Sequence, residues 1–228
     1  MNSQQQHKLE FLARHRAARR QDLRLACASD TSEDALRKQL DSGMKAMLKT
    51  FGSGKCKGYQ IADPKVAAKL GALPSATRVP GAEQTLPTTF AIAEYMARLI
   101  HTKKVKHGLM LREEFETHFP GLIKDGVAFE PCYALALREE GLCRLERYDV
   151  DLGSAQPEER VLNALSRLRN KSETLSEMMD SGAFTYVLIT TAKRRELLKD
   201  SRLKRIQFDG YPARVELVAS DILQNLGR

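Results

Sequence analysis

The sequence predicts a mixed α/β protein in two parts, and three observations carry this prediction. Helical periodicity fills most of residues 4–49, apolar runs of strand length recur through residues 127–218, and a Pro-containing stretch with little periodicity separates the two. The second part runs α, β, β, β, α, β, which is the order of a sheet packed against helices. We therefore expect an N-terminal domain over residues 1–72, a linker over 73–86 and an α/β domain over 87–228.

Positive charge is concentrated in the first part. The chain has 37 Lys and Arg against 29 Asp and Glu, a formal net charge of +8, and residues 1–70 hold fourteen of the basic side chains but only seven of the acids. This small module therefore carries nearly all of the excess. A positive field confined to one module is what a polyanionic partner selects, whereas a charge that only favours solubility is normally spread along the chain. The distribution favours nucleic acid as the partner.

Three helices are expected in this basic module, over residues 4–15, 21–28 and 32–49. In the third, apolar side chains recur at spacings of four, four and three and so share one face: Leu36, Leu40, Met44 and Met47. The other side carries polar and basic residues: Arg37, Lys38, Asp41, Ser42 and Lys45. A helix with an apolar back and a basic front suits the major groove of DNA. An ordinary amphipathic surface helix is the alternative for this pattern alone.

A basic hairpin is expected after the third helix, since residues 51–61 show the pattern of a strand, a Gly-rich tip and a second strand. Glycines let the tip approach a phosphate backbone, and the lysines there would neutralise it. Three helices followed by a basic hairpin is a winged helix-turn-helix pattern, which predicts binding to double-stranded DNA. The predicted DNA contacts are Arg19 and Arg20 at the second helix, Arg37, Lys38 and Lys45 on the third, and Lys55 and Lys57 on the hairpin.

Several function classes lack their sequence patterns. Gly52-Ser-Gly-Lys55 is followed by Cys56 and not by Ser or Thr, so it is not a nucleotide-binding P-loop. The four cysteines and five histidines do not fall into zinc-ligand spacing, and no G-x-S-x-G elbow occurs. Apolar runs are too short to span a bilayer, and the first ten residues lack the apolar stretch of a secretory signal. We expect a cytoplasmic protein with no membrane partner and no small-molecule cofactor.

The second part supplies the strands of the α/β domain. Helices are expected over residues 88–101, 109–119, 157–179 and 192–200, and strands over residues 127–129, 133–137, 142–150, 184–190, 203–208 and 214–218. The run 184–190 is almost continuously apolar, which is typical of a central strand buried on both faces.

Two short motifs in this part resemble those of PD-(D/E)XK nuclease-like domains. Ile123-Lys124-Asp125-Gly126 is similar to the Pro-Asp strand start, and Tyr148–Ser154 is similar to the later E-x-D-x-G-[S/T] strand end. Over most of residues 4–200 the chain resembles the replication-relaxation family of bacterial plasmids and other mobile elements. The resemblance implies a winged helix-turn-helix joined to a restriction-endonuclease-like αβββαβ domain, in a protein that controls transcription or replication.

The chain departs from the family pattern at the positions that would carry catalysis. Lys124 stands where the family has proline, Asp149 where it has glutamate, and Asp151 where an active nuclease of this fold has lysine. These departures predict an inactive nuclease-like domain. Lys171 on the long helix is a candidate for a relocated catalytic lysine.

Three functions stay open at this point. The leading one is a non-enzymatic DNA-binding protein whose second domain is a platform for a homodimer or another partner. The second is a Mg²⁺-dependent DNA endonuclease in which Asp125, Asp149 and Asp151 hold the metal, because such an enzyme needs converging carboxylates and side chains two apart on a strand share a face. The third is a protein-interaction adaptor whose basic module acts only through its charge.

Overall fold

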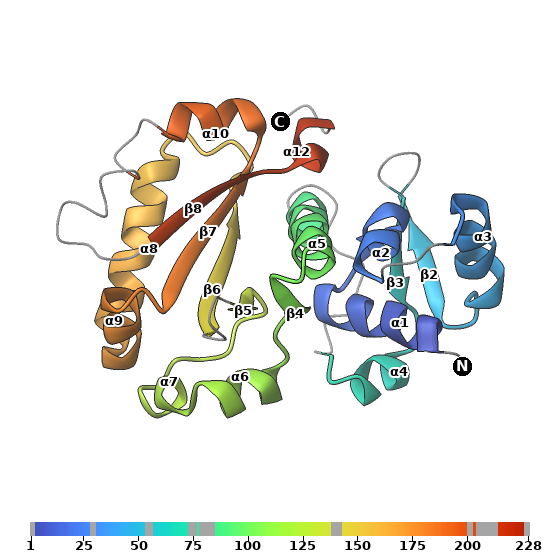
Figure 1. Cartoon of the computed structure of the whole chain (residues 1–228), viewed down its shortest axis with the longest axis horizontal. Coiled ribbons are helices and arrows are strands. Elements are labelled where there is room, and N and C mark those ends of the chain that lie inside the picture. The colour runs from blue at the N-terminus through green and yellow to red at the C-terminus, as the bar shows by residue number, and fades with distance from the viewer. Residues whose placement is uncertain are drawn as a thin grey trace. The chain divides into compact units, whose positions relative to one another are not determined.

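The computed structural model of the chain is mixed α/β, as the sequence predicts (Figure 1). It describes residues 3–27, 31–52, 57–72, 77, 85–137, 143–199, 203 and 214–225. The chain divides into two compact units, residues 1–111 and residues 112–228. Among the described residues no helix combines the length and apolar character needed to cross a membrane.

The first unit contains a three-stranded sheet and the helices around it. Its elements are α1 (Ser3–His15), β1 (Ala18–Arg19), α2 (Arg20–Ala26), α3 (Glu33–Lys38), the π-helical turn η1 (Gln39–Gly43), β2 (Leu48–Phe51), β3 (Gly58–Ile61), α4 (Pro64–Lys69), α5 (Thr85–His101) and β4 (Val105–Leu109). Strands β2 and β3 form the expected antiparallel hairpin, from the pair Leu48–Ile61 to the pair Phe51–Gly58. The two-residue strand β1 pairs with the other edge of β3, so the sheet order is β1-β3-β2.

The third helix buries the predicted apolar face but is shorter than expected. Leu36, Leu40 and Met44 are almost fully buried, which confirms the periodicity. Helical structure ends at Gly43 and not at residue 49, because Leu48 lies in β2 opposite Ile61 and the backbone from there on pairs with β3. Across α3 and η1 the residues Leu36, Leu40 and Met44 are buried, while Arg37 and Lys38 are exposed.

The boundary between the units lies beyond the expected linker. Helix α5 was predicted to begin the second domain, but it packs against α2, β1 and α1 of the first unit. Its apolar residues, such as Phe90 and Met96, are buried, and Phe90 stacks on Phe51 of the hairpin with ring centroids 5.8 Å apart. Helix α5 is apolar on most of its circumference, so it needs a partner along its whole length, and α2 and the small sheet supply one.

A buried histidine makes the stability of the first unit sensitive to acid. His15 ends α1, is 3% exposed, and packs its ring 4.2 Å from that of Phe11. Within the described chain neither ring nitrogen has a hydrogen-bond partner. Burial, assisted by the charge of Arg14, lowers the pKa of His15 to about 3. The imidazole is therefore neutral in the folded protein, while the unfolded chain takes up a proton below about pH 6.5.

Folding stability is consequently expected to fall as the pH drops below 6.5, and His15 should account for about 2 kcal/mol of the loss by pH 5. Urea unfolding of the wild type and of His15→Leu, at pH 7.5 and pH 5, measures this contribution. The variant should lose about 2 kcal/mol less than the wild type over this interval. Equal losses in both proteins would show that His15 accepts its proton in the folded state.

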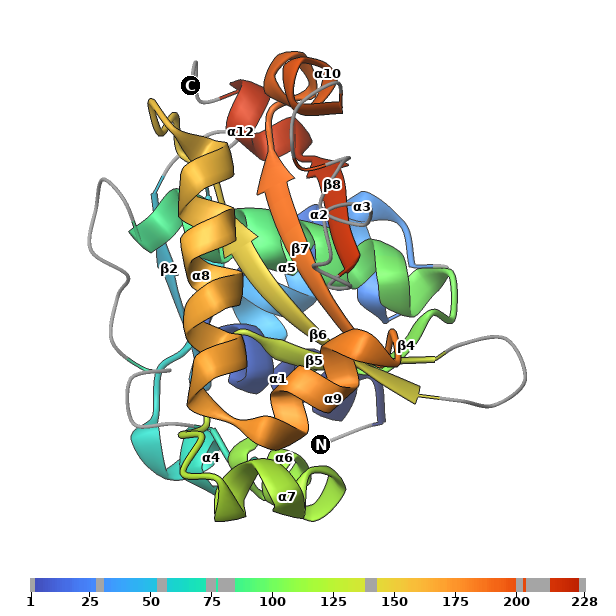
Figure 2. The same ribbon diagram turned by 90° about the vertical axis from the view of Figure 1, so that its left-hand side faces the viewer.

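The second unit holds the strands of the predicted α/β part. Its elements are α6 (Arg112–His118), α7 (Pro120–Lys124), β5 (Tyr133–Leu137), β6 (Cys143–Val150), α8 (Pro157–Lys171), α9 (Glu173–Asp180), β7 (Phe184–Thr190), α10 (Ala192–Lys199), β8 (Arg214–Ala219) and α12 (Asp221–Asn225). Strands β5 to β8 lie in chain order; β5 and β6 are antiparallel, and β6, β7 and β8 are mutually parallel. Helix α8 lies alongside the strands of this unit (Figures 1 and 2). Strand β7 is buried at every residue, as its apolar run predicts.

Two predictions for this unit are corrected by the structure. Residues 127–129 are not a strand, because Gly126 (φ 76°) ends α7 and the amide of Val127 donates to the carbonyl of Leu122, closing the helix with a Schellman-type turn. The long helix expected over residues 157–179 is broken at Ser172. This residue is extended (φ −152°), and its hydroxyl caps α9 by accepting from the amide of Leu175 at 3.0 Å. The strand expected over residues 203–208 falls outside the described residues, except Leu203.

Candidate functional site

Basic side chains of the third helix lie on its exposed side. Arg37 and Lys38 of α3 and Lys45 after η1 are exposed, while Leu36 and Leu40 of the same helix are buried. Arg37 forms an ion pair with Asp34 at 3.4 Å, but the two side chains are 53% and 83% exposed, so water screens the pair strongly. Arg37, Lys38 and Lys45 therefore lie at the surface, as a contact with DNA would require.

The hairpin adds Lys57 to the same surface. Its Nζ lies 3.3 and 3.4 Å from the carboxylate oxygens of Asp41 in η1, and 5.4 Å from the ring centroid of Tyr59. Burial alone would lower the pKa of Lys57, but the contact with Asp41 outweighs it and raises the pKa above its ordinary value. Lys57 thus stays charged. We call the set Arg37, Lys38, Asp41, Ser42, Lys45 and Lys57 the basic surface.

Of two further predicted DNA contacts, the structure describes Arg20 but not Lys55. Arg20, at the first position of α2, is about one-third exposed and lies 2.5 Å from the carboxylate of Glu33, at the first position of α3. It therefore borders the basic surface but is already paired. Lys55 lies outside the described residues.

Arg19 is corrected, because the structure buries it where the sequence predicts a surface contact. Only 6% of the residue is exposed. Its Nε and Nη2 donate to the two carboxylate oxygens of Asp22 at 3.0 and 2.8 Å, and Nη2 lies 3.7 Å from Glu94 of α5. The backbone amide of Arg19 also donates to Asp22, so the pair caps α2. Arg19 joins α2 to α5 and is removed from the predicted DNA contacts.

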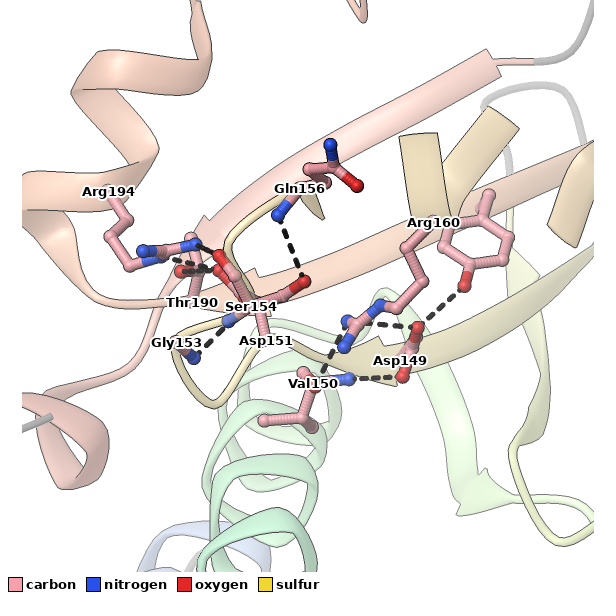
Figure 3. A network of polar contacts seen from close by, with 10 residues as sticks. Asp149, Val150, Asp151, Gly153, Ser154, Gln156, Arg160, Thr190 and Arg194 are labelled. Carbon is pink, nitrogen blue, oxygen red and sulfur yellow. Dashed lines mark hydrogen bonds and ion pairs between the residues drawn. The ribbon is translucent and has the colours of Figure 1, made fainter. Parts of the chain in front are cut away.

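The predicted carboxylates of the second unit are held by donors from different elements, as Figure 3 shows for two of them. Asp151, directly after β6, is almost fully buried. One oxygen accepts from the amides of Gly153 (3.2 Å) and Ser154 (2.9 Å); the other accepts from the Thr190 hydroxyl (3.2 Å) and from Arg194 Nε (2.6 Å). Burial would raise the pKa of Asp151, but the Ser154 amide and Arg194 lower it below its usual value. Asp151 ties the end of β6 to β7 and α10.

Asp149 has a second, separate set of partners. One carboxylate oxygen accepts from the Tyr186 hydroxyl of β7 at 2.7 Å and lies 3.1 Å from Arg160 Nη2 of α8; the other accepts from the amide of Val150 at 2.8 Å (Figure 3). Arg160 also donates to the carbonyl of Val150 at 3.2 Å. Burial and the charge of Asp149 raise the pKa of Tyr186, so its proton stays in the bond. Asp149 fastens α8 onto the sheet.

Asp125 shares no hydrogen-bond partner with Asp149 or Asp151 among the contacts described for the three. It follows α7, and its Oδ2 accepts from the Ser172 hydroxyl at 2.5 Å and from the Thr174 amide at 3.0 Å. These two bonds lower the pKa of Asp125. The carboxylate thus joins α7 to the start of α9.

The three acids therefore do not converge as the endonuclease hypothesis requires. Throughout the described chain no group of three or more His, Cys, Asp and Glu side chains is placed to hold one metal ion. Arginines face two of the three carboxylates. Each of these ion pairs joins the strand β6 region to a helix, α8 for Asp149 and α10 for Asp151.

The sequence does not predict the contact of Asp41 with the hairpin. The pattern places Asp41 on the polar side of the third helix but does not show that its carboxylate faces Lys57 and Tyr59, whose hydroxyl donates to it at 3.0 Å. Neither the helical periodicity nor the hairpin pattern identifies this contact, because Asp41 and Tyr59 are 18 positions apart in the chain. Comparison of the chain with protein-family models, with curated proteins and with solved structures finds no match in any of the three.

Proposed function

We propose that the first unit is a winged helix-turn-helix that binds double-stranded DNA through α3, η1 and the hairpin of β2 and β3. The protein then acts in transcriptional or replication control, as the resemblance to the replication-relaxation family of plasmids and mobile elements implies. The observation that carries the proposal is the basic surface. Three exposed cations follow one helix, and the hairpin's Lys57 is bound to that same helix through Asp41.

The backbone arrangement supports this use of the surface. Three helices precede an antiparallel hairpin whose second strand also pairs with β1, and the contacts of Asp41 with Lys57 and Tyr59 join the end of the third helix to that strand. The major groove of B-DNA, about 12 Å wide, admits one α-helix. A helix whose apolar side is packed in a core can place its polar side in the groove without a change in the fold. The hairpin then reaches the neighbouring phosphates.

The charges support duplex DNA as the partner. Each phosphate that a lysine or arginine neutralises releases a condensed counterion, which contributes about 0.9 of a decade of affinity at 0.1 M salt. Arg37, Lys38 and Lys45 are exposed, and the side chain of Lys57 is 40% exposed. Four such contacts suffice for non-specific binding at low salt.

We propose a non-catalytic role for the second unit, that of a platform for a homodimer or another partner. The support is the pairing of Asp151 with Arg194 and of Asp149 with Arg160, which uses both carboxylates to hold helices against the sheet.

Replacing the three exposed cations of the third helix together tests the proposal. The variant Arg37→Ala/Lys38→Ala/Lys45→Ala is expected to bind a 20–30 base-pair duplex about 100- to 1,000-fold more weakly than the wild type at 0.1 M salt, because three counterion-releasing contacts are lost. The side chains are exposed, so the free energy of unfolding should change little. Fluorescence anisotropy of a labelled duplex measures the affinity.

A matched control removes the same charge elsewhere on the first unit. Lys65 and Lys69 of α4 and Lys104 after α5 are also exposed. The variant Lys65→Ala/Lys69→Ala/Lys104→Ala should keep most of the affinity. Equal losses in the two triple variants would mean that only net charge matters, which is the adaptor reading and not a groove-binding helix.

A further inference from the structure

A carboxylate stands in the middle of the basic surface. Asp41 lies one helical turn after Arg37, and Lys45 follows the end of the helical segment four positions later. A negative charge at this place repels phosphate, so electrostatics alone predicts that Asp41 weakens DNA binding. The contacts of Asp41 point the other way.

Asp41 is the junction between the third helix and the hairpin. Its Oδ1 accepts from the hydroxyl of Tyr59 at 3.0 Å, and both of its oxygens face Nζ of Lys57. Tyr59 is 1% exposed and sits at the centre of the small sheet, paired with Ala18 on one side and Thr50 on the other. The hydroxyl that meets Asp41 is therefore held by the rigid part of the unit.

Lys57 lies just before the second hairpin strand, and the direction of its long side chain decides which surface its charge joins. The residue directly precedes β3, and its side chain is 40% exposed. A lysine has about 2 kcal/mol of rotamer entropy to lose when it binds a phosphate. The carboxylate on one side and the Tyr59 ring, 5.4 Å from Nζ, on the other already restrict the ammonium group to the edge of the third helix. An ammonium group has three donors, so it can keep Asp41 and still meet a phosphate.

We propose that Asp41 is a positioning residue that strengthens DNA binding, because it fixes Lys57 of the hairpin beside the third helix so that both meet the duplex together. The inference rests on the proposed function. It predicts that removing this one negative charge from the DNA-binding face weakens binding, which is opposite to the effect expected from charge alone.

The third helix offers a matched control in Asp34. This carboxylate pairs with Arg37 at 3.4 Å, is 83% exposed, and has no contact with the hairpin among the described residues. Asp34→Ala is expected to tighten duplex binding about 2- to 5-fold at 0.1 M salt, since it removes only repulsion and a screened pair. Asp41→Ala is expected to weaken binding about 5- to 10-fold, since one phosphate contact is lost. The two variants change the net charge equally, and the predicted effects differ in sign.

A double-variant cycle tests whether the effect runs through Lys57. In a Lys57→Ala background, Asp41→Ala should no longer weaken binding and should tighten it, as Asp34→Ala does. A loss of the same size in both backgrounds would overturn the role assigned to Lys57. Asp41→Asn, which can still accept from Tyr59 but cannot pair with Lys57, decides the question if the alanine variant is unfolded by circular dichroism; it too should bind more weakly than the wild type.

The outcomes also separate this inference from the proposed function. If the wild type binds duplex DNA with a clear salt dependence and Asp41→Ala binds more tightly, the positioning role is wrong and the DNA-binding proposal stands. If the wild type and all variants fail to bind, the proposed function fails and the inference fails with it.

Discussion

Replacing Arg19 by methionine is expected to lower the free energy of unfolding by about 3–5 kcal/mol, because it breaks a buried ion pair from one side. The side chains of Arg19, Asp22 and Glu94 are 7%, 3% and 6% exposed. Methionine fills most of the volume of the arginine but leaves Asp22 without its two guanidinium donors. Glu94 keeps Arg98, at 2.9 Å, so most of the cost falls on Asp22. Chemical denaturation at pH 7 measures the change.

The pH dependence of this loss has a definite sign. Burial raises the pKa of Asp22, and Arg19 partly offsets that rise. Without Arg19 the folded pKa is higher still, so the variant regains stability as the pH falls and Asp22 takes up a proton. The destabilisation should therefore shrink between pH 7 and pH 4.

Arg24, exposed on the same helix, is the control for Arg19. Arg24→Met should change the free energy of unfolding by less than about 0.5 kcal/mol. A different result would support the surface role that the sequence suggests for Arg19. In that case Arg19→Met would leave the free energy of unfolding unchanged, lower the affinity for DNA tenfold and make its salt slope shallower.

Asp151→Asn is expected to cost about 3 kcal/mol, because it removes the charge that faces Arg194 and turns an amide donor or a weaker acceptor toward it. Asp151 is fully buried at its side chain, whereas Arg194 is 29% exposed and keeps the Ser154 carbonyl as acceptor, which limits the loss. The matched control is Asp180→Asn. Asp180 pairs with Arg169 at 3.0 Å but is 49% exposed, so breaking that pair should cost less than about 1 kcal/mol.

The same variant distinguishes the structural role of Asp151 from a catalytic one. Purified wild type is incubated with supercoiled plasmid and Mg²⁺, beside Asp151→Asn and Asp149→Ala. Cleavage by the wild type that disappears in a variant of unchanged stability would establish the endonuclease alternative and contradict the structural role. We expect a loss of stability in Asp151→Asn and no cleavage that depends on either carboxylate.

The sequence predicts local structure well wherever periodicity and turn residues decide it. The buried row of Leu36, Leu40 and Met44, the hairpin ending in Ile61 and the central strand over residues 184–190 all follow from such patterns. Each is fixed by side chains within a few residues of one another. These elements were enough to predict a mixed α/β fold and to locate the basic surface.

The sequence predictions fail where a contact with a distant part of the chain determines the structure. Arg19 looks like a surface cation until Glu94, 75 positions further along the chain, meets it on α5. The ion pair of Asp151 with Arg194 of α10 likewise joins residues that are distant in the chain. Asp22 is only three positions from Arg19, but the local sequence does not identify Glu94 or Arg194 as a partner. The domain boundary is misplaced for the same reason, since the burial of α5 against α2 depends on the tertiary fold.

The salt dependence of duplex binding by the whole chain tests the central claim most directly. If Arg37, Lys38, Lys45 and Lys57 each neutralise a phosphate, the logarithm of the association constant should fall against the logarithm of salt concentration with a slope of about −3 to −4. The Arg37→Ala/Lys38→Ala/Lys45→Ala variant should have a slope shallower by about 2 to 3. An affinity for DNA that does not change between 50 and 200 mM salt, or equal slopes in the two proteins, would contradict the assignment of the basic surface to DNA.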